Sequence, residues 1–170
     1  MKKAVIVING AGGVGKDTLC DAAATSYITR NISTITPIKE IAALCGWSGA
    51  KDNKSRKFLS DMKRLCADYN DFPTNWAKAQ FDIFLNTNEE ILFVHIREAE
   101  EIAKFVAATG GVAKTLLVRG GERFSQRFGK YGNVSDDEVE NYSYDYYFNN
   151  DTSIDDAKKR FVEFLASILA

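Results

Sequence analysis

A glycine-rich stretch near the N-terminus constrains the fold more than any other part of the sequence. It follows the apolar, β-branched run Ala4 to Ile8 and precedes a segment with helical periodicity. Glycines let a backbone curl with its N–H groups pointing inward, because no Cβ blocks close approach to an anion. The spacing Gly10-x4-Gly15-Lys16, between a strand and a helix, is typical of a phosphate-binding loop. We therefore expect a nucleoside triphosphate site formed by Gly10, Gly12, Gly13, Val14, Gly15, Lys16, Asp17 and Thr18.

One position of this loop departs from the usual pattern. Asp17 stands where a Ser or Thr normally places a hydroxyl on Mg²⁺, and Thr18 follows it. A carboxylate holds Mg²⁺ through its oxygens or through water, so we expect Asp17 to be the metal ligand. Lys16 supplies positive charge for the β- and γ-phosphates. The alternative is a glycine-rich strand-to-helix turn that carries a surface lysine.

Size and charge limit the remaining possibilities. A chain of 170 residues is long enough for one full domain, so we expect a single domain over 1–170. The net charge of -1 gives no sign of a nucleic-acid polymer or a membrane as partner. The apolar run at 4–8 is too short for a secretion signal or a membrane span, which favours a cytoplasmic protein. Cys20, Cys45 and Cys66 lack C-x-x-C spacing, so we expect small buried hydrophobes.

Strand-like and helical segments alternate along the chain. The strands are expected at 4–8, 32–36, 91–96, 113–118 and 144–148, with helices at about 16–30, 38–45, 58–69, 74–88, 99–109 and 154–168. This alternation predicts an α/β fold of three layers, α/β/α, around a five-stranded parallel sheet. We expect a helical acceptor-binding region at about 38–88. The polar, glycine- and arginine-bearing segment at about 119–141 has the composition of a lid.

The sequence resembles the nucleoside-monophosphate-kinase-like branch of the P-loop NTPases, and most closely the phage-type deoxynucleoside monophosphate kinases. The family shares the aspartate of Gly15-Lys16-Asp17-Thr18. Weaker similarities follow in the right order along the chain, at 37–40 (Pro-Ile-Lys-Glu), 56–59 (Arg-Lys-Phe-Leu), 75–78 (Asn-Trp-Ala-Lys), 95–97 (His-Ile-Arg), 118–119 (Val-Arg) and 144–154.

The resemblance implies transfer of a phosphoryl group from ATP, with Mg²⁺, to a nucleotide or similar phosphorylated acceptor. Lys16 would then hold the β- and γ-phosphates, Arg97 would clamp the acceptor phosphate, and Arg119 would lie against the adenine at the lid hinge. Arg123 and Arg127, one helical turn apart, would reach the transferring group from the closed lid, the alternative being a solvated face. Dephospho-coenzyme A or a phosphorylated isoprenoid precursor are other acceptors of this class. We expect a monomer or a homodimer.

His95 is the main departure from the family. It stands at the end of the third strand, where the family has an aspartate that helps to order Mg²⁺ or the acceptor. Either Asp17 and Glu98 supply the acidic groups, or catalysis is weakened or directed to another acceptor. A local hydrogen bond is the simplest alternative role for this histidine. The second hypothesis for the whole chain is therefore an ATP-binding switch that is catalytically weak.

Overall fold

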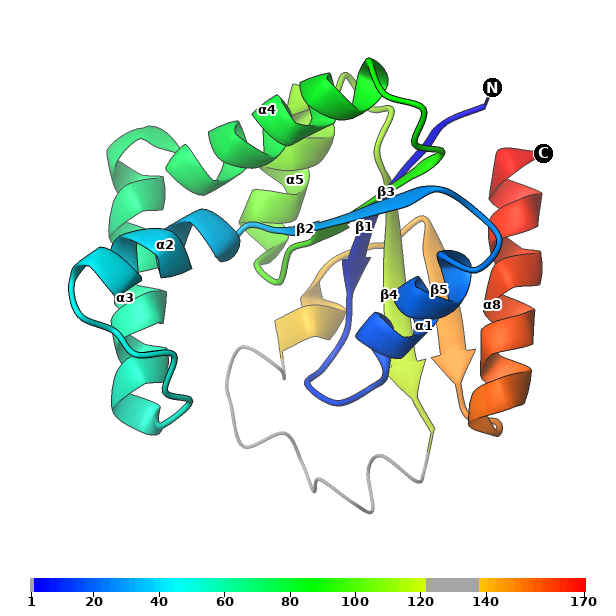
Figure 1. Ribbon diagram of the computed structural model, residues 1–170, viewed down its shortest axis with the longest axis horizontal. Helices are drawn as coiled ribbons and strands as arrows, with labels where there is room; N and C mark the ends of the chain where they lie inside the picture. The colour runs from blue at the N-terminus through cyan, green and yellow to red at the C-terminus, as the bar shows by residue number, and fades with distance from the viewer. Residues whose placement is uncertain (1, 122–137) are drawn as a thin grey trace.

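The centre of the molecule is a parallel sheet of five strands (Figure 1). The computed structural model describes residues 2–121 and 138–170. The strands are β1 (Ala4–Asn9), β2 (Thr29–Ser33), β3 (Ile91–His95), β4 (Lys114–Gly120) and β5 (Tyr146–Asn150), in the order β2-β3-β1-β4-β5. Each neighbouring pair is parallel. With helices on both faces, this confirms the predicted three-layer α/β/α fold.

Strand β1 lies in the middle of the sheet. All six of its residues are buried, because helices cover both faces of the sheet. Ile8 pairs with His95 of β3 on one side and with Leu116 of β4 on the other. The glycine-rich loop that leaves β1 therefore starts between the carboxyl ends of β3 and β4, the edge where parallel α/β sheets bind ligands.

The helices form two layers. They are α1 (Lys16–Ala23), α2 (Thr36–Leu44), α3 (Asn53–Asn70), α4 (Phe72–Leu85), α5 (Ala99–Ala108) and α8 (Ile154–Leu169), with a 3₁₀ turn, η1 (Glu138–Asn141). Ile6 and Ile8 point toward α1 and α8, whereas Val5 and Val7 point toward α4 and α5. The alternation of side chains along β1 thus divides the interior into two apolar clusters, one on each face of the sheet.

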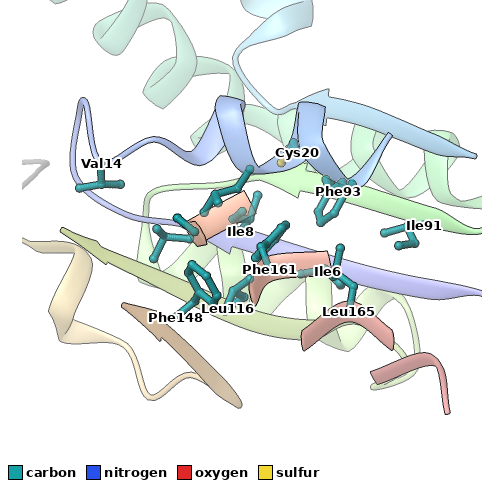
Figure 2. Close-up of a cluster of buried hydrophobic side chains, with 14 of the residues drawn as sticks. Ile6, Ile8, Val14, Cys20, Ile91, Phe93, Leu116, Phe148, Phe161 and Leu165 are labelled. Atoms are coloured by element: carbon teal, nitrogen blue, oxygen red, sulfur yellow. The ribbon is translucent and has the colours of Figure 1, made fainter. Parts of the chain in front are cut away.

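Aromatic rings fill the cluster between the sheet and α8 (Figure 2). The Phe161 ring lies 6.3 Å from that of Phe93 and 5.1 Å from that of Phe148, measured between centroids. The Phe148 ring meets it edge to face, a geometry worth about 0.5–1.5 kcal/mol beyond the burial itself. Figure 2 also shows Val14 of the glycine-rich loop at one end of this cluster, so the loop is anchored in the core.

Several predicted boundaries were wrong. The second strand lies at Thr29–Ser33 instead of 32–36. Pro37, directly after the predicted strand, sits in the first turn of α2, where its missing N–H costs nothing. The first helix ends at Ala23 rather than near Arg30. The last strand runs from Tyr146 to Asn150, two residues later than predicted.

The helical region also differs in detail from the prediction. Helix α3 begins at Asn53, earlier than expected, because the Asp52 carboxylate accepts a hydrogen bond from the Ser55 N–H at 2.8 Å and caps the helix. The expected turn at 70–74 is a single residue, Asp71, in the left-handed conformation (φ 53°). Helix α4 then starts at once, with Pro73 in its first turn.

The cysteines differ in their surroundings. All three are free thiols, but only Cys20 is buried, which raises its pKa to about 12, with the negative charge of Asp17 adding to the shift. Cys66 is half-buried and Cys45 is exposed, so the prediction of three buried cysteines was wrong. Among the residues that the structure describes, no helix is both long and apolar enough to cross a membrane.

Candidate phosphate-binding site

The glycine-rich loop connects β1 to α1 in a conformation that only glycine adopts easily. Gly15, which precedes α1, has φ 92°. A Cβ at Gly15 would lie 2.7 Å from the Asn150 Nδ2, and a Cβ at Gly10 would lie 2.5 Å from the Val118 carbonyl oxygen. Both contacts are too close for a side chain. The backbone can therefore pack against β4 and β5 only because these two positions are glycine.

Lys16 lies across the first turn of the loop. Its Nζ donates to the Gly10 carbonyl at 2.5 Å and to the Ala11 carbonyl at 3.1 Å. Lys16 is also the first residue of α1, whose unpaired N–H groups and dipole favour an anion at the same place. An ammonium group and a helix N-terminus thus converge on the mouth of the loop, an arrangement that can hold a chain of phosphates.

The exposed side chains of Asp17 and Thr18 follow in the first turn of α1. A carboxylate next to the phosphate-binding lysine supplies oxygen for a divalent cation. Within residues 2–121 and 138–170, no group of three or more His, Cys, Asp and Glu side chains could hold a metal by itself. A cation at Asp17 would therefore need the remaining ligands from phosphate and water, which is how Mg²⁺ is usually held beside nucleotides.

Asn9, the last residue of β1, belongs to a buried polar network that sequence reasoning missed. Its Nδ2 donates to the Arg97 carbonyl at 3.0 Å and to the Tyr144 hydroxyl at 2.8 Å, and its Oδ1 accepts from the Gly10 N–H at 2.8 Å. The Tyr144 hydroxyl donates to the Val139 carbonyl at 2.8 Å. Asn9 thus joins the start of the loop to the segments after β3 and before β5. A polar residue directly after a wholly apolar strand is the only sequence signal for this role.

Asn150 supports the opposite side of the loop. Its Nδ2 donates to the Val14 carbonyl at 2.8 Å, and the same nitrogen occupies the space that a Cβ on Gly15 would need. The structure gives it a direct contact with the phosphate loop, while Asn149 beside it is exposed.

His95 lies beside the loop, at the carboxyl end of β3. Its Nε2 is 3.5 Å from the Asn31 Oδ1 in β2. Burial lowers the pKa of His95 below its ordinary value of 6.5, and the positive charge of Lys16 lowers it further, against the opposing effect of Asp17. The imidazole is therefore neutral at pH 7. The charges of Lys16 and Asp17 are thus close enough to His95 to act on its pKa.

Glu98, one of the two predicted substitutes for an acidic residue at position 95, has a different partner. It precedes α5, and its carboxylate accepts from the Lys63 Nζ of α3 at 2.7 Å. The same nitrogen lies 2.6 Å from a carboxylate oxygen of Glu101. Burial and the nearby Glu98 charge raise the pKa of Glu101. Glu98 thus links α5 to the helical region, which leaves Asp17 as the carboxylate of the loop.

The arginines predicted for the site have separate positions. Arg97 is exposed and directly follows Ile96 at the end of β3, on the same edge of the sheet as the loop. Arg119 lies in β4, one residue beyond the predicted end of this strand at 113–118. Arg123 and Arg127, with most of the predicted lid at 119–141, lie outside the described residues.

Arg119 pairs with a residue that follows the undescribed segment. Its Nε and Nη2 donate to the two carboxylate oxygens of Glu140 in η1, at 2.9 and 2.7 Å. These hydrogen bonds raise the pKa of Arg119. The guanidinium carbon lies 4.4 Å from the centroid of the Tyr147 ring. The side chain predicted to lie against adenine is therefore held between a carboxylate and an aromatic ring, and Glu140 was not found from the sequence.

Comparison with known proteins gives likenesses of structure. No family model matches the sequence, and no curated protein matches it either. The tunicamycin resistance protein of Deinococcus radiodurans superposes with a TM-score of 0.60 at 10% identity, over 96% of each chain. Shikimate kinase from Aquifex aeolicus gives 0.52 at 10% identity, over 96% of this chain and 97% of that one. A gluconokinase from Sinorhizobium meliloti gives 0.52 at 14% identity, over 98% and 93%.

These likenesses extend over nearly the whole of each chain. The parallel five-stranded sheet, the helices on both its faces and the loop after β1 together give this chain the P-loop kinase fold. The part of the predicted resemblance that concerns the fold of P-loop kinases is thereby supported by structure. The finer part, similarity to phage-type deoxynucleoside monophosphate kinases, stays a prediction.

Proposed function

We propose that this chain is an ATP-dependent phosphotransferase that moves the γ-phosphoryl group to a nucleoside monophosphate or a similar small phosphorylated acceptor. The observation that carries the proposal is the geometry of the loop. Lys16 spans the first turn of the loop, and glycines at 10 and 15 allow the loop to pack closely against the sheet. The loop opens at the edge formed by the carboxyl ends of the strands. Phosphoryl transfer requires positioning and charge stabilisation above all, and both are available here.

The residues present fit ATP and Mg²⁺. The loop's backbone N–H groups and the Lys16 ammonium would hold the phosphates, and Asp17, with Thr18 beside it, would hold the cation. When bound, Mg²⁺ neutralises charge that develops on the phosphate oxygens. Asp17 is suited to this role because its carboxylate is exposed and because Glu98, the other nearby candidate, is paired with Lys63.

The acceptor side of the proposal rests on Arg97 and on the helices at 38–88. Arg97 follows β3, immediately beside β1, so an acceptor phosphate bound there would face the donor loop. We assign the lid role to 119–141 and contact with the transferring group to Arg123 and Arg127. We further propose one domain over 1–170, acting in the cytoplasm on small molecules rather than on nucleic-acid polymers or membranes.

An ATP-binding switch is the second candidate, and His95 is the observation that favours it. A neutral imidazole stands where the family places a carboxylate, so the site has one acidic group fewer for ordering Mg²⁺. In that case the protein would bind ATP and change conformation without efficient transfer.

A coupled assay of ADP release separates the two candidates. We expect ATP and Mg²⁺ to give turnover with at least one member of a panel of nucleoside monophosphates, dephospho-coenzyme A and phosphorylated isoprenoid precursors. The Lys16→Ala variant is the control for contaminating kinases. Tight ATP binding in calorimetry, with no acceptor-dependent ADP release across the panel, would reject the phosphotransferase and support the switch.

A further inference from the structure

Helix α3 presents an apolar stripe that nothing in the described structure covers. The helix spans 18 residues, none of which is buried. Phe58, Leu65 and Tyr69 lie within a narrow arc, since they are seven and four residues apart, and the last two are 61% and 87% exposed. At 1.5 Å per residue the stripe is about 16 Å long. A continuous exposed stripe of large apolar side chains indicates a contact surface.

The other side of α3 is fixed to the body of the molecule. Lys63, whose side chain is only 12% exposed, bridges Glu98 and Glu101 at the start of α5. Figure 1 shows α3 at the edge of the molecule, on the side away from α8. The Lys63 bridge fixes the rotation of the helix about its axis. The apolar stripe, on the opposite side of the helix, is therefore held facing outward.

Charged side chains of alternating sign run beside the stripe. Lys57, Asp61, Arg64 and Asp68 follow one another along one flank of the helix. They form ion pairs within the helix, between Lys57 and Asp61 at 2.5 Å and between Arg64 and Asp68 at 3.7 Å. All four side chains are more than 40% exposed, so they are free to exchange partners with another surface.

We propose that α3 is the contact helix of a homodimer, in which it packs antiparallel against α3 of a second copy. A two-fold axis near position 63 would bring Phe58 of one copy onto Tyr69 of the other. It would also bring Met62, a half-buried residue in the same arc of the helix, onto Leu65. The apolar stripe would then meet itself along its full length. An interface about a two-fold axis uses the same surface on both copies, so the surface must be self-complementary.

The charges obey the same symmetry. The axis that matches the apolar side chains places Lys57 opposite Asp68 and Asp61 opposite Arg64, because each pair is centred on nearly the same point of the helix. In antiparallel helices the same flank of each helix meets its counterpart, so these opposite charges fall side by side. The same order forms the ion pairs within the helix, and a second copy would offer each of these exposed charges an opposite charge across the axis. A second copy accounts for both patterns.

The self-association of the full-length protein tests this directly, by sedimentation equilibrium across concentrations up to about 100 µM. We expect a dimer, and we expect Leu65→Asp to raise its Kd by about 100-fold, because the change occurs twice across the axis. Val112→Asp is the matched control, since Val112 is 56% exposed but lies in the loop after α5. It should leave the Kd unchanged.

Charge reversal tests the antiparallel register. Lys57→Glu and Asp68→Lys should each weaken self-association by about 10-fold, since each sets like charges opposite one another twice. An equimolar mixture of the two variants should restore a dimer, because each mutated position then faces an opposite charge. Circular dichroism checks that α3 remains folded.

Three results would overturn the proposal. A wild-type chain that is monomeric at about 100 µM would leave the stripe to another kind of partner. A dimer that Leu65→Asp leaves intact would place the contact elsewhere. A wild-type dimer whose two charge variants fail to associate with each other would exclude the antiparallel register.

Discussion

Among single residues, Lys16 has the clearest consequence. Its ammonium already binds two loop carbonyls, so it is preorganised for a phosphate that takes its place beside them. We expect Lys16→Ala to lower kcat by about 100-fold or more, since it removes a charge that acts on the transferring group. Circular dichroism and thermal unfolding should show an intact fold. Lys158→Ala, on α8, is the matched control and should leave kcat unchanged.

His95 gives a prediction about pH. It is the only histidine of the chain, so its imidazole resonance can be followed by NMR without assignment. Burial lowers its pKa, so the titration midpoint should lie below 6.5. Asp17→Asn should lower the midpoint further, because the Asp17 charge favours the imidazolium. A midpoint above 6.5, or no response to Asp17→Asn, would contradict the position of His95 beside the loop.

The same shift has a defined effect on stability. As the pH falls below 6.5, the unfolded chain takes up this proton before the folded protein does. The contribution of His95 to the free energy of unfolding should therefore be constant above pH 6.5. It should decrease as the pH falls from 6.5 to the lower native pKa. Denaturation by urea at several pH values, compared between the wild type and His95→Gln, measures this contribution. The variant should show the smaller loss in that window.

Sequence reasoning reached some of these residues and not others. The loop from Gly10 to Thr18 could be predicted because its requirements are local: close backbone turns, a lysine, and a strand and helix on either side. Asn9 and Glu140 could not, since their roles depend on partners that are far away in sequence, such as Tyr144 for the first and Arg119 for the second. Spacing along the chain does not show which distant side chains will meet.

At the scale of elements, the end of β5 braces the phosphate loop through Asn150. Asn150→Ala removes the hydrogen bond to the Val14 carbonyl and so leaves the phosphate loop less ordered. ATP would then have to order the loop when it binds, which weakens its affinity. We expect the Kd for ATP to rise by about 10-fold in calorimetry, with a loss of about 1 kcal/mol in the free energy of unfolding. Asn149→Ala is the matched control. If Asn149→Ala and Asn150→Ala changed the Kd for ATP equally, β5 would stabilise the fold without a specific effect of Asn150 on the phosphate loop.

The errors in predicted elements have a common physical source. Pro37 and Pro73 lie outside the predicted strands and helices, but each lies in the first turn of a helix, where proline is tolerated. Hydrophobic patterning identified the five strands and six α-helices of the described chain, but not the 3₁₀ turn η1, which fell within the predicted lid. The ends of elements depend on caps such as Asp52 and on single left-handed residues such as Asp71, which periodicity does not show.

At the scale of the whole molecule, the sheet separates two apolar clusters that must fold together if 1–170 is one domain. Phe161 of α8 belongs to one cluster and Phe105 of α5 to the other, and both are fully buried. Their backbones are on opposite sides of the sheet, so they share no contacts. Strands β1, β3 and β4, however, each contribute side chains to both clusters through their alternating faces, so loss of one cluster should unfold the other.

Paired core substitutions test that coupling. Phe161→Leu and Phe105→Leu should each lower the free energy of unfolding by about 1–2 kcal/mol. The double variant should lose the sum to within about 0.5 kcal/mol, because the sites are independent in packing. Urea unfolding followed by far-UV circular dichroism and by tryptophan fluorescence should give one coincident transition for every variant. Two transitions, with each substitution moving only one of them, would show that the layers on the two faces of the sheet unfold separately and would reject a single domain.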